Sequence, residues 1–248
     1  MKITNILMLF LLPISVFGQA SFDKANELYQ QEKFEEAVQV YEQILEGGQH
    51  SVELYYNLGN AYYKLNQIAP AIYNYEKALL LDPNNSDVKN NLTFARNMMI
   101  DEIKEVPKVG FTHWLGGFTS VFHYDSWAKI AVGFSFLLLF CFVGYYFSKK
   151  MILKRVMFSM MIIFLTFSVL CIIIAAFEKN QVQEDNPAIV FAESVSVKGE
   201  PKENSNNVAT LHEGTKIYVI ESVDDYYKVE LLNGSQGWLP KSTVKTLK

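Results

Sequence analysis

Cysteine is almost absent from this 248-residue sequence, which contains only Cys141 and Cys171. Each lies inside a long uncharged run. If the runs are helices that leave a shared turn, the two thiols lie about 12 Å and about 24 Å from it, at different depths. This argues against a disulfide framework. His113 and His123 have no cysteine or carboxylate partner at ligand spacing, so no metal site is expected.

The sequence also lacks the patterns that carry catalysis. It has no glycine-rich phosphate loop, no carboxylate pair in a pocket context and no nucleophile beside a base. Its 22 basic residues are outnumbered by 26 acidic ones, and outside one short turn no basic cluster suggests nucleic-acid binding. A chain of this length forms two or three small units rather than one large enzyme core. We expect no catalytic residue, cofactor or nucleic-acid partner.

What the sequence does contain is two long uncharged runs, 130–147 and 156–177. Each can cross a hydrocarbon core of about 30 Å at about 1.5 Å per helical residue. The second holds thirteen Ile, Leu, Phe or Val residues, which favour insertion by about 4 to 8 kcal/mol in total. Core helices of a soluble domain are the alternative, but such helices usually carry a polar stripe. The runs predict two transmembrane helices in a lipid bilayer.

The eight residues between the runs, 148–155, include four basic side chains and no acidic one. Short basic loops lie on the cytoplasmic side of a membrane. The flanking segments, 1–129 and 178–248, are then expected on the opposite side. In a bacterial inner membrane, both soluble parts would face the periplasm.

The N-terminus is consistent with this orientation. Lys2 is followed by the apolar run 6–12 and then by the small residues around Gly18, a pattern typical of a secretory signal peptide. We expect a signal peptide at 1–18, with cleavage after Gly18 or after Ala20. A third, permanent membrane anchor is the alternative, because the stretch 3–20 carries no charge.

Residues 19–100 show an internal repeat with a period of about 34 residues, within the range of helical solenoids. The matching pairs are Ala25/Gly59, Leu28/Tyr62, Phe34/Ile68, Ala37/Ala71, Tyr41/Tyr75 and Ile44/Ala78. Small residues at this period, with aromatic residues between them, indicate paired helices stacked as a solenoid. The second copy resembles the tetratricopeptide repeat at Tyr55, Leu58, Gly59, Tyr62, Ala71, Tyr75, Ala78 and Pro83. We expect copies at about 18–51 and 52–85 and a capping helix at 86–100.

The concave face of such a solenoid, formed by the first helix of each repeat, is the expected partner-binding surface. Helical spacing places six candidate residues there: Asn26, Tyr29, Tyr56, Asn60, Tyr63 and Lys64. The resemblance implies a groove for peptides or partner helices. The family's carboxylate clamp is not expected, because Phe22, Tyr56 and Asp87 stand where that clamp has lysine. The alternative is that these tyrosines are ordinary solenoid surface.

Between the repeats and the first run, residues 101–129 are rich in aromatic residues. Apolar side chains recur at spacings of three and four: Phe111, Trp114, Leu115, Phe118, Val121 and Phe122. This predicts an amphipathic segment in the membrane interface. After the second run, 178–187 reads as a polar linker.

Residues 188–248 carry short Val-, Ile- and Tyr-rich runs separated by turn residues. The runs are 188–192, 195–198, 208–211, 215–222, 226–232 and 237–240. They predict a small all-β barrel, and the order of features resembles bacterial SH3-like domains. Tyr226, Tyr227 and Trp238 are candidates for a peptide- or glycan-binding strip. The predicted fold class is a multidomain membrane protein, with a tetratricopeptide solenoid, two transmembrane helices and an SH3-like barrel. We expect Gly59→Leu to unfold the solenoid alone.

The complete order of these parts resembles the BatE-type proteins of the Bacteroides aerotolerance operons. The resemblance implies a non-enzymatic protein-interaction scaffold or adaptor in an inner-membrane envelope complex linked to aerotolerance or oxidative stress. It also implies membrane partners with von Willebrand A domains. The alternative is an envelope sensor that binds peptidoglycan through the SH3-like domain. An eight-residue cytoplasmic turn is too short for a signalling module, which favours the scaffold.

Overall fold

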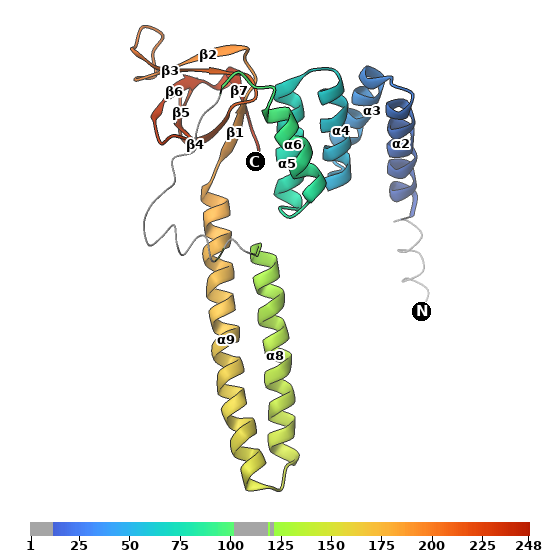
Figure 1. Ribbon diagram of the computed structural model, residues 1–248, viewed down its shortest axis with the longest axis vertical. Coiled ribbons are helices and arrows are strands. Elements are labelled where there is room, and N and C mark those ends of the chain that lie inside the picture. The colour runs from blue at the N-terminus through green and yellow to red at the C-terminus, as the bar shows by residue number, and fades with distance from the viewer. Residues whose placement is uncertain (1–11, 102–118, 120–121) are drawn as a thin grey trace. The chain divides into compact units, whose positions relative to one another are not determined.

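The computed structural model describes residues 12–101, 119 and 122–248, and these form two compact units (Figure 1). One unit combines the N-terminal helices with the C-terminal strands, and the other is a helical hairpin. The start of the expected signal peptide and most of the expected interfacial segment lie outside the described residues. The first described helix, α2 (Leu12–Gln30), runs without interruption past both expected cleavage positions.

The repeat region consists of five helices in sequence order (Figure 1). After α2 come α3 (Phe34–Glu46), α4 (Val52–Lys64), α5 (Ile68–Leu81) and α6 (Ser86–Arg96). Two of them begin with side-chain caps. Ser51 Oγ accepts from the backbone N–H of Leu54, and Asn85 Oδ1 accepts from that of Val88, which satisfies donors that the first turn leaves unpaired. The expected helical repeat region is present, and one further helix, α6, follows the second repeat.

Within the second repeat, α4 and α5 approach closely at Gly59. A Cβ atom placed on Gly59 would lie 2.7 Å from Cε1 of Tyr75, well inside van der Waals contact. Tyr75 is itself 1% exposed. The small residue therefore exists at this position because the ring of the facing helix fills the space.

The C-terminal part is one antiparallel sheet of seven strands in the order β3-β2-β6-β5-β4-β1-β7. All six expected runs form strands, and a short seventh strand follows a 3-10 turn. The bounds are β1 Pro187–Val190, β2 Ser194–Lys198, β3 Asn207–His212, β4 Lys216–Val223, β5 Tyr226–Leu231, β6 Gln236–Pro240 and β7 Val244–Thr246.

The expectation of a closed barrel is wrong, because the sheet keeps two unpaired edges. Strands β3 and β7 stand at opposite ends of the strand order and do not pair with each other. Strands β2 and β6 meet at the single pair Lys198↔Trp238. Gly237 permits this close approach, since a Cβ there would lie 2.4 Å from Cγ1 of Val197 and 2.8 Å from the oxygen of Lys198.

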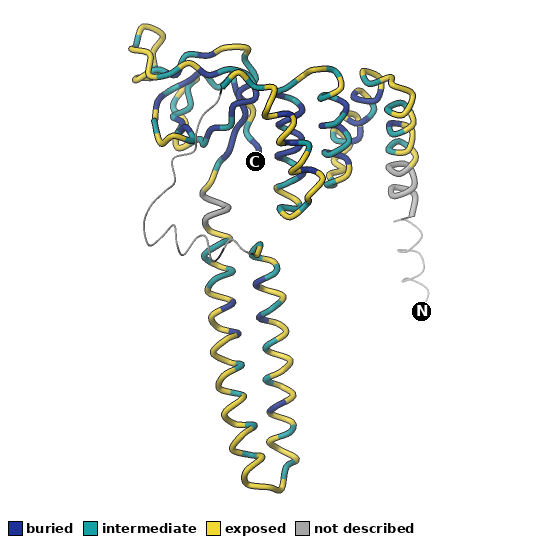
Figure 2. Tube along the Cα trace, in the orientation of Figure 1, coloured by how far each residue is buried: buried dark blue, intermediate teal, exposed yellow. Residues whose placement is uncertain are grey.

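The repeats and the sheet share a hydrophobic core. Ile189 and Leu247 of the sheet region are buried in one cluster with Ile72 and Tyr75 of α5 and Leu92 of α6. Figure 2 shows buried segments in both the strands and the helices of this unit. Because Tyr75 belongs to a core that the sheet completes, the structure favours an effect of Gly59→Leu on both parts over the expected unfolding of the solenoid alone.

Polar contacts also link the repeats to the sheet beside this shared core, and we call the whole contact region between the two parts the joint. The buried carboxylate of Glu76 in α5 lies 2.6 Å from Nη2 of Arg96 and 2.7 Å from Nζ of Lys216 in β4. Asp101, just after α6, accepts from His212 and from the hydroxyl of Thr215, the latter at 2.7 Å. Asp101 is thus bonded to the last residue of β3 and to the residue just before β4.

The second unit is a hairpin of α8 (Tyr124–Phe147) and α9 (Met151–Glu184). Both are long and apolar enough to cross a membrane, and only 11% of the most apolar window of each is buried. Most residues of the hairpin are exposed (Figure 2), and many of them are large and apolar, which disfavours the reading as soluble core helices. Two expected boundaries differ from the structure. The turn is three residues, 148–150, rather than eight, and the expected linker 178–187 is helical through Glu184.

Serine hydroxyls join the two helices of the hairpin. Ser168 Oγ lies 3.2 Å from the backbone oxygen of Ala131 and 3.3 Å from Oγ of Ser135. The Ser135 hydroxyl also donates to the same carbonyl at 3.0 Å. Next to them, the ring of Phe134 stacks on Phe167 of α9 at a centroid distance of 5.6 Å.

Candidate functional site

The candidate site is the surface formed by the first helices of the repeats, α2, α4 and α6, which we call the groove after the sequence prediction. Asn26 and Tyr29 lie on α2, while Tyr56, Asn60 and Tyr63 lie on α4. All five are half-buried. Lys64, the sixth candidate, is exposed in the last turn of α4.

An amide and phenol network forms the floor of the groove and repeats with the sequence period. In the first repeat, Asn26 Oδ1 accepts from the hydroxyl of Tyr41 at 2.6 Å and from Nδ2 of Asn57 at 2.9 Å. In the second repeat, one period further along the chain, Asn60 Oδ1 accepts from Tyr75 and from Asn91, both at 2.7 Å. Each asparagine therefore links the second helix of its repeat to the first helix of the next.

The tyrosines of the groove are close enough to influence one another. Tyr56 and Tyr75 have ring centroids 6.2 Å apart. Burial, with a smaller contribution from Tyr56, raises the pKa of Tyr29. Burial also raises the pKa of Tyr41 to about 12 and raises that of Tyr75 further. The phenols are therefore protonated at neutral pH and available as hydrogen-bond donors.

Sequence reasoning missed three groove residues that the same period could have found. Asn57 and Asn91 stand one period apart and complete the network at equivalent positions. Phe94 follows Asn60 by the same interval. It lies on α6 with 59% of its surface exposed. Phe94 therefore places an exposed apolar ring on α6 at the position equivalent to Asn60.

On the sheet, the three expected strip residues do not share a face. Tyr227 pairs with Leu239, which is fully buried, and packs against the core of the sheet. Because side chains alternate along a strand, Tyr226 lies on the other face, as does Trp238 opposite Lys228. The three residues therefore do not form one strip. Tyr226 and Trp238 lie on the face of the sheet that points away from its core, and Tyr227 lies on the core face.

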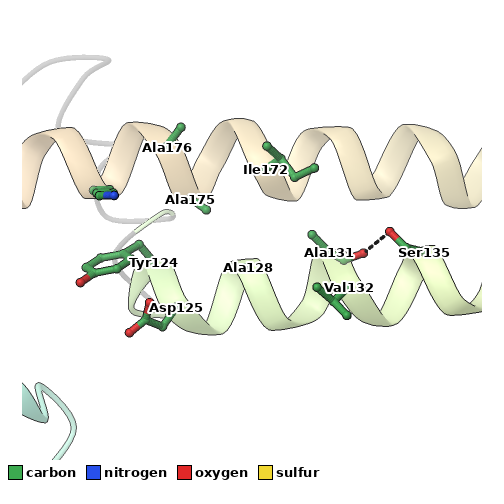
Figure 3. Close-up of a pocket in the computed structure, with 10 residues that line it drawn as sticks. Tyr124, Asp125, Ala128, Ala131, Val132, Ser135, Ile172, Ala175 and Ala176 are labelled. Atoms are coloured by element: carbon green, nitrogen blue, oxygen red, sulfur yellow. Dashed lines mark hydrogen bonds between the residues drawn. The ribbon is translucent and has the colours of Figure 1, made fainter.

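A separate hollow of about 490 Å³ lies between the two hairpin helices (Figure 3). Four alanines line it, Ala128, Ala131, Ala175 and Ala176, together with Val132, Ser135 and Ile172. Tyr124, Asp125 and Lys179 stand at the end away from the turn. The small side chains set its depth, and its lining is mostly apolar. Within residues 12–101, 119 and 122–248, no cluster of His, Cys, Asp or Glu is arranged to hold a metal ion.

Two family models match the repeat region. The family described as Tetratricopeptide repeat matches residues 52–85, and the one described as TPR repeat matches residues 25–66. A search of curated proteins found no match. Residues 25–85 thus contain tetratricopeptide repeats, which generally mediate protein–protein interaction and typically act as non-enzymatic scaffolds.

Proposed function

We propose that this protein is a non-enzymatic adaptor that binds a protein partner in the groove of α2, α4 and α6 while its hairpin holds it in a bacterial inner membrane. The observation that carries the proposal is the network of half-buried aromatic rings and side-chain amides on the tetratricopeptide repeats. Tyrosine is enriched at protein interfaces because it combines a large apolar ring with a polar end.

The shared core supports a topology with both soluble parts on one side of the membrane. Residues Ile72 and Ile189 pack in the same cluster although the hairpin separates them in sequence. A bilayer cannot pass through a packed core, so the chain between Asp101 and Asn186 must cross the membrane an even number of times. Two helices of sufficient length meet this requirement. The basic residues at 149–155 favour a cytoplasmic turn and a periplasmic folded unit.

Within this proposal, the partners are membrane proteins of an envelope complex. The resemblance to BatE-type proteins suggests von Willebrand A-domain partners and a role in aerotolerance. The joint between the repeats and the sheet changes how such an adaptor would work. Groove and sheet present their surfaces in a fixed relation, rather than as two binders on flexible tethers.

Site-specific photo-cross-linking in cells tests the proposal. A photoreactive amino acid at Tyr63 samples the groove, and the same amino acid at Tyr62 is the matched control. Tyr62 is the adjacent residue, but its hydroxyl donates to Glu42 outside the groove network. Capture of a defined membrane protein from position 63 and not from position 62 is expected. Equal capture from both positions, or none from position 63, would reject the groove as the binding site.

A peptidoglycan-binding sensor is the second candidate. It is favoured by the outer face of the sheet, where Trp238 is flanked by Lys198 and Lys228 on the neighbouring strands. An aromatic ring beside lysines suits a glycan that carries carboxylates. Photo-cross-linking from Tyr226 distinguishes the two functions, because capture of glycan strands there, with nothing captured at Tyr63, would favour the sensor.

A further inference from the structure

The hollow between α8 and α9 occupies only one end of the hairpin. On α8 its lining runs from Tyr124 to Ser135, which is about 16 Å at ~1.5 Å per residue, in a helix that continues to Phe147. One leaflet of a bilayer, headgroups included, is about 20 Å thick. The transmembrane helix of a partner would contact the hairpin across both leaflets. The extent of the hollow therefore matches a lipid of a single leaflet.

The lining of the hollow changes from apolar to charged along the hairpin. Toward the middle of the helices it consists of alanines with Val132 and Ile172, while Tyr124 and Asp125 stand at the end away from the turn (Figure 3). Lys179 of α9 lines the same end. The volume of about 490 Å³ lies within the range of ~300–1,000 Å³ that is usual for small-molecule sites. A phospholipid has the same order of parts, because its apolar chain is joined to a charged headgroup.

Asp125 and Lys179 carry opposite charges at this end of the hollow but do not pair with each other. They lie on different helices, and within residues 12–101, 119 and 122–248 no ion pair joins them. The ammonium of Lys179 forms no hydrogen bond or ion pair with any described residue. Oδ2 of Asp125 lies 3.6 Å from Nδ1 of His123, which is beyond hydrogen-bond distance. Both charged groups are exposed, so both are available to a ligand.

A headgroup with one phosphate and one ammonium complements these two charges. The phosphate accepts from the ammonium of Lys179, and the ammonium of the headgroup donates to the carboxylate of Asp125. An anionic headgroup without an ammonium would leave Asp125 facing a phosphate of the same sign. We propose that the hollow binds one molecule of phosphatidylethanolamine, with an acyl chain along the alanine-lined part. This inference rests on the proposed insertion of the hairpin in a membrane and not on the groove.

Lipid binding to the full-length protein in detergent, followed by native mass spectrometry, tests the inference. The probe is phosphatidylethanolamine. The matched control is phosphatidylglycerol with the same acyl chains, which keeps the phosphate and lacks the ammonium. Phosphatidylethanolamine should bind about two- to fivefold more tightly, the effect of one exposed charge pair. Equal affinity for both lipids, tighter binding of phosphatidylglycerol, or binding of neither would overturn the inference.

Two variants separate the roles of the charges. Asp125→Asn should abolish the preference for phosphatidylethanolamine, because only that lipid has an ammonium for the carboxylate. Lys179→Gln should weaken the binding of both lipids about two- to fivefold, because both have the phosphate. Lys129→Gln is the control, since Lys129 is exposed near the same end of α8 but does not line the hollow. Equal effects of the two lysine variants would contradict the assignment.

Photo-cross-linking in cells identifies what fills the hollow. A photoreactive amino acid at Ala176 samples the lining, and the same amino acid at Ile173 is the matched control, because Ile173 is exposed on the same helix outside the hollow. Phosphatidylethanolamine should be captured more from position 176 than from position 173. Capture of a protein from position 176 would place a partner helix in the hollow and overturn the inference, while the membrane adaptor would stand. Release of the protein from membranes by alkaline carbonate would show that the hairpin is not inserted, and both would be wrong.

Discussion

The ammonium of Lys216 in strand β4 lies 2.7 Å from the carboxylate of Glu76 in helix α5, across 140 residues of sequence that include the whole membrane hairpin. The Glu76 side chain is 7% exposed, and that of Lys216 is 21% exposed. This ion pair connects the repeats to the sheet, which the sequence predicts as two separate domains. Its consequence is that a change in the repeats affects the sheet.

A double-mutant cycle between Glu76→Gln and Lys216→Met measures this coupling. We expect a coupling energy of about 1–3 kcal/mol, because both groups are largely removed from water. The cycle between Glu76→Gln and Arg96→Met is the matched comparison. Arg96 is 46% exposed, so solvent screening should reduce that coupling to about 0.5 kcal/mol. Urea unfolding of the four variants in each cycle provides the measurement, and a Lys216 coupling near zero would refute the joint.

Gly59→Leu should unfold the repeats and the sheet in the same transition. The new side chain must displace Tyr75, at an overpacking cost of about 1–3 kcal/mol or more, and Tyr75 packs in the core that Ile189 completes. Far-UV circular dichroism follows the helices. Fluorescence of Trp238, in a background where the other two tryptophans are phenylalanine, follows the sheet. Both midpoints should fall together.

Gly199→Ala is the control for Gly59→Leu. A Cβ at Gly199 would meet its nearest neighbour, Oγ of Ser205, at an ordinary 3.6 Å. Its midpoint should stay close to that of the parent. A fall in the helical midpoint of Gly59→Leu with an unchanged Trp238 midpoint would show that the two parts fold independently.

The contribution of Asp101 to the joint should depend on pH in the acid range. Burial alone would raise the pKa of this carboxyl, but the hydrogen bonds from His212 and Thr215 outweigh it and hold the pKa below its ordinary value. A depressed folded-state pKa contributes stability above the unfolded-state value, about 3.9. That stability is lost as the pH falls through the folded-state pKa.

Asp101→Asn removes this titration. At pH 7 the variant should be less stable by about 1–3 kcal/mol, the range for hydrogen bonds to a charged group. The difference between parent and variant should shrink below about pH 4. Urea midpoints measured from pH 7 to pH 3 provide the test. A difference that is constant over this range would mean that the charge of Asp101 does not stabilise the joint.

Sequence periodicity predicts the helices and the strands, but it does not predict that the repeats and the sheet pack against each other. The repeat period locates the helix pairs, and alternating runs locate six strands, because both patterns record the face that each element buries. They do not record what covers that face. Nothing local to Ile189 or Glu76 indicates this packing, since Ile72 lies 117 positions before Ile189 and Lys216 lies 140 positions after Glu76.

Two further differences have local causes. Hydropathy ends the second apolar run at Phe177, whereas the backbone of α9 continues through polar residues to Glu184. Helical hydrogen bonding does not require apolar side chains, so hydropathy underestimates the helix. The strip predicted from Tyr226, Tyr227 and Trp238 does not take the alternation of side chains along a strand into account. Adjacent strand residues point to opposite faces, and the pairing with Leu239 places Tyr227 on the core side.

Ser168→Ala should loosen the hairpin by about 0.6–1.7 kcal/mol, the range for interhelical hydrogen bonds in membranes. The substitution removes only the hydroxyl that reaches Ala131 of α8. Thr166→Val is the matched control, because the Thr166 hydroxyl bonds only to Ile162 of its own helix among the described contacts. Unfolding of the hairpin by SDS titration provides the measurement, and equal effects of the two variants would count against the interhelical bond.

The central claim is that the repeats and the sheet form one unit on a single, external side of the membrane. Labelling of two single cysteines with a membrane-impermeant maleimide tests it most directly, in a background that lacks Cys141 and Cys171. Gln39→Cys reports on the repeats and Asn204→Cys on the sheet, and both positions are exposed. In whole cells with a permeabilised outer membrane, both cysteines should react before the inner membrane is lysed. Reaction of either one only after lysis would place the two parts on opposite sides, or the whole unit in the cytoplasm, and would contradict the account.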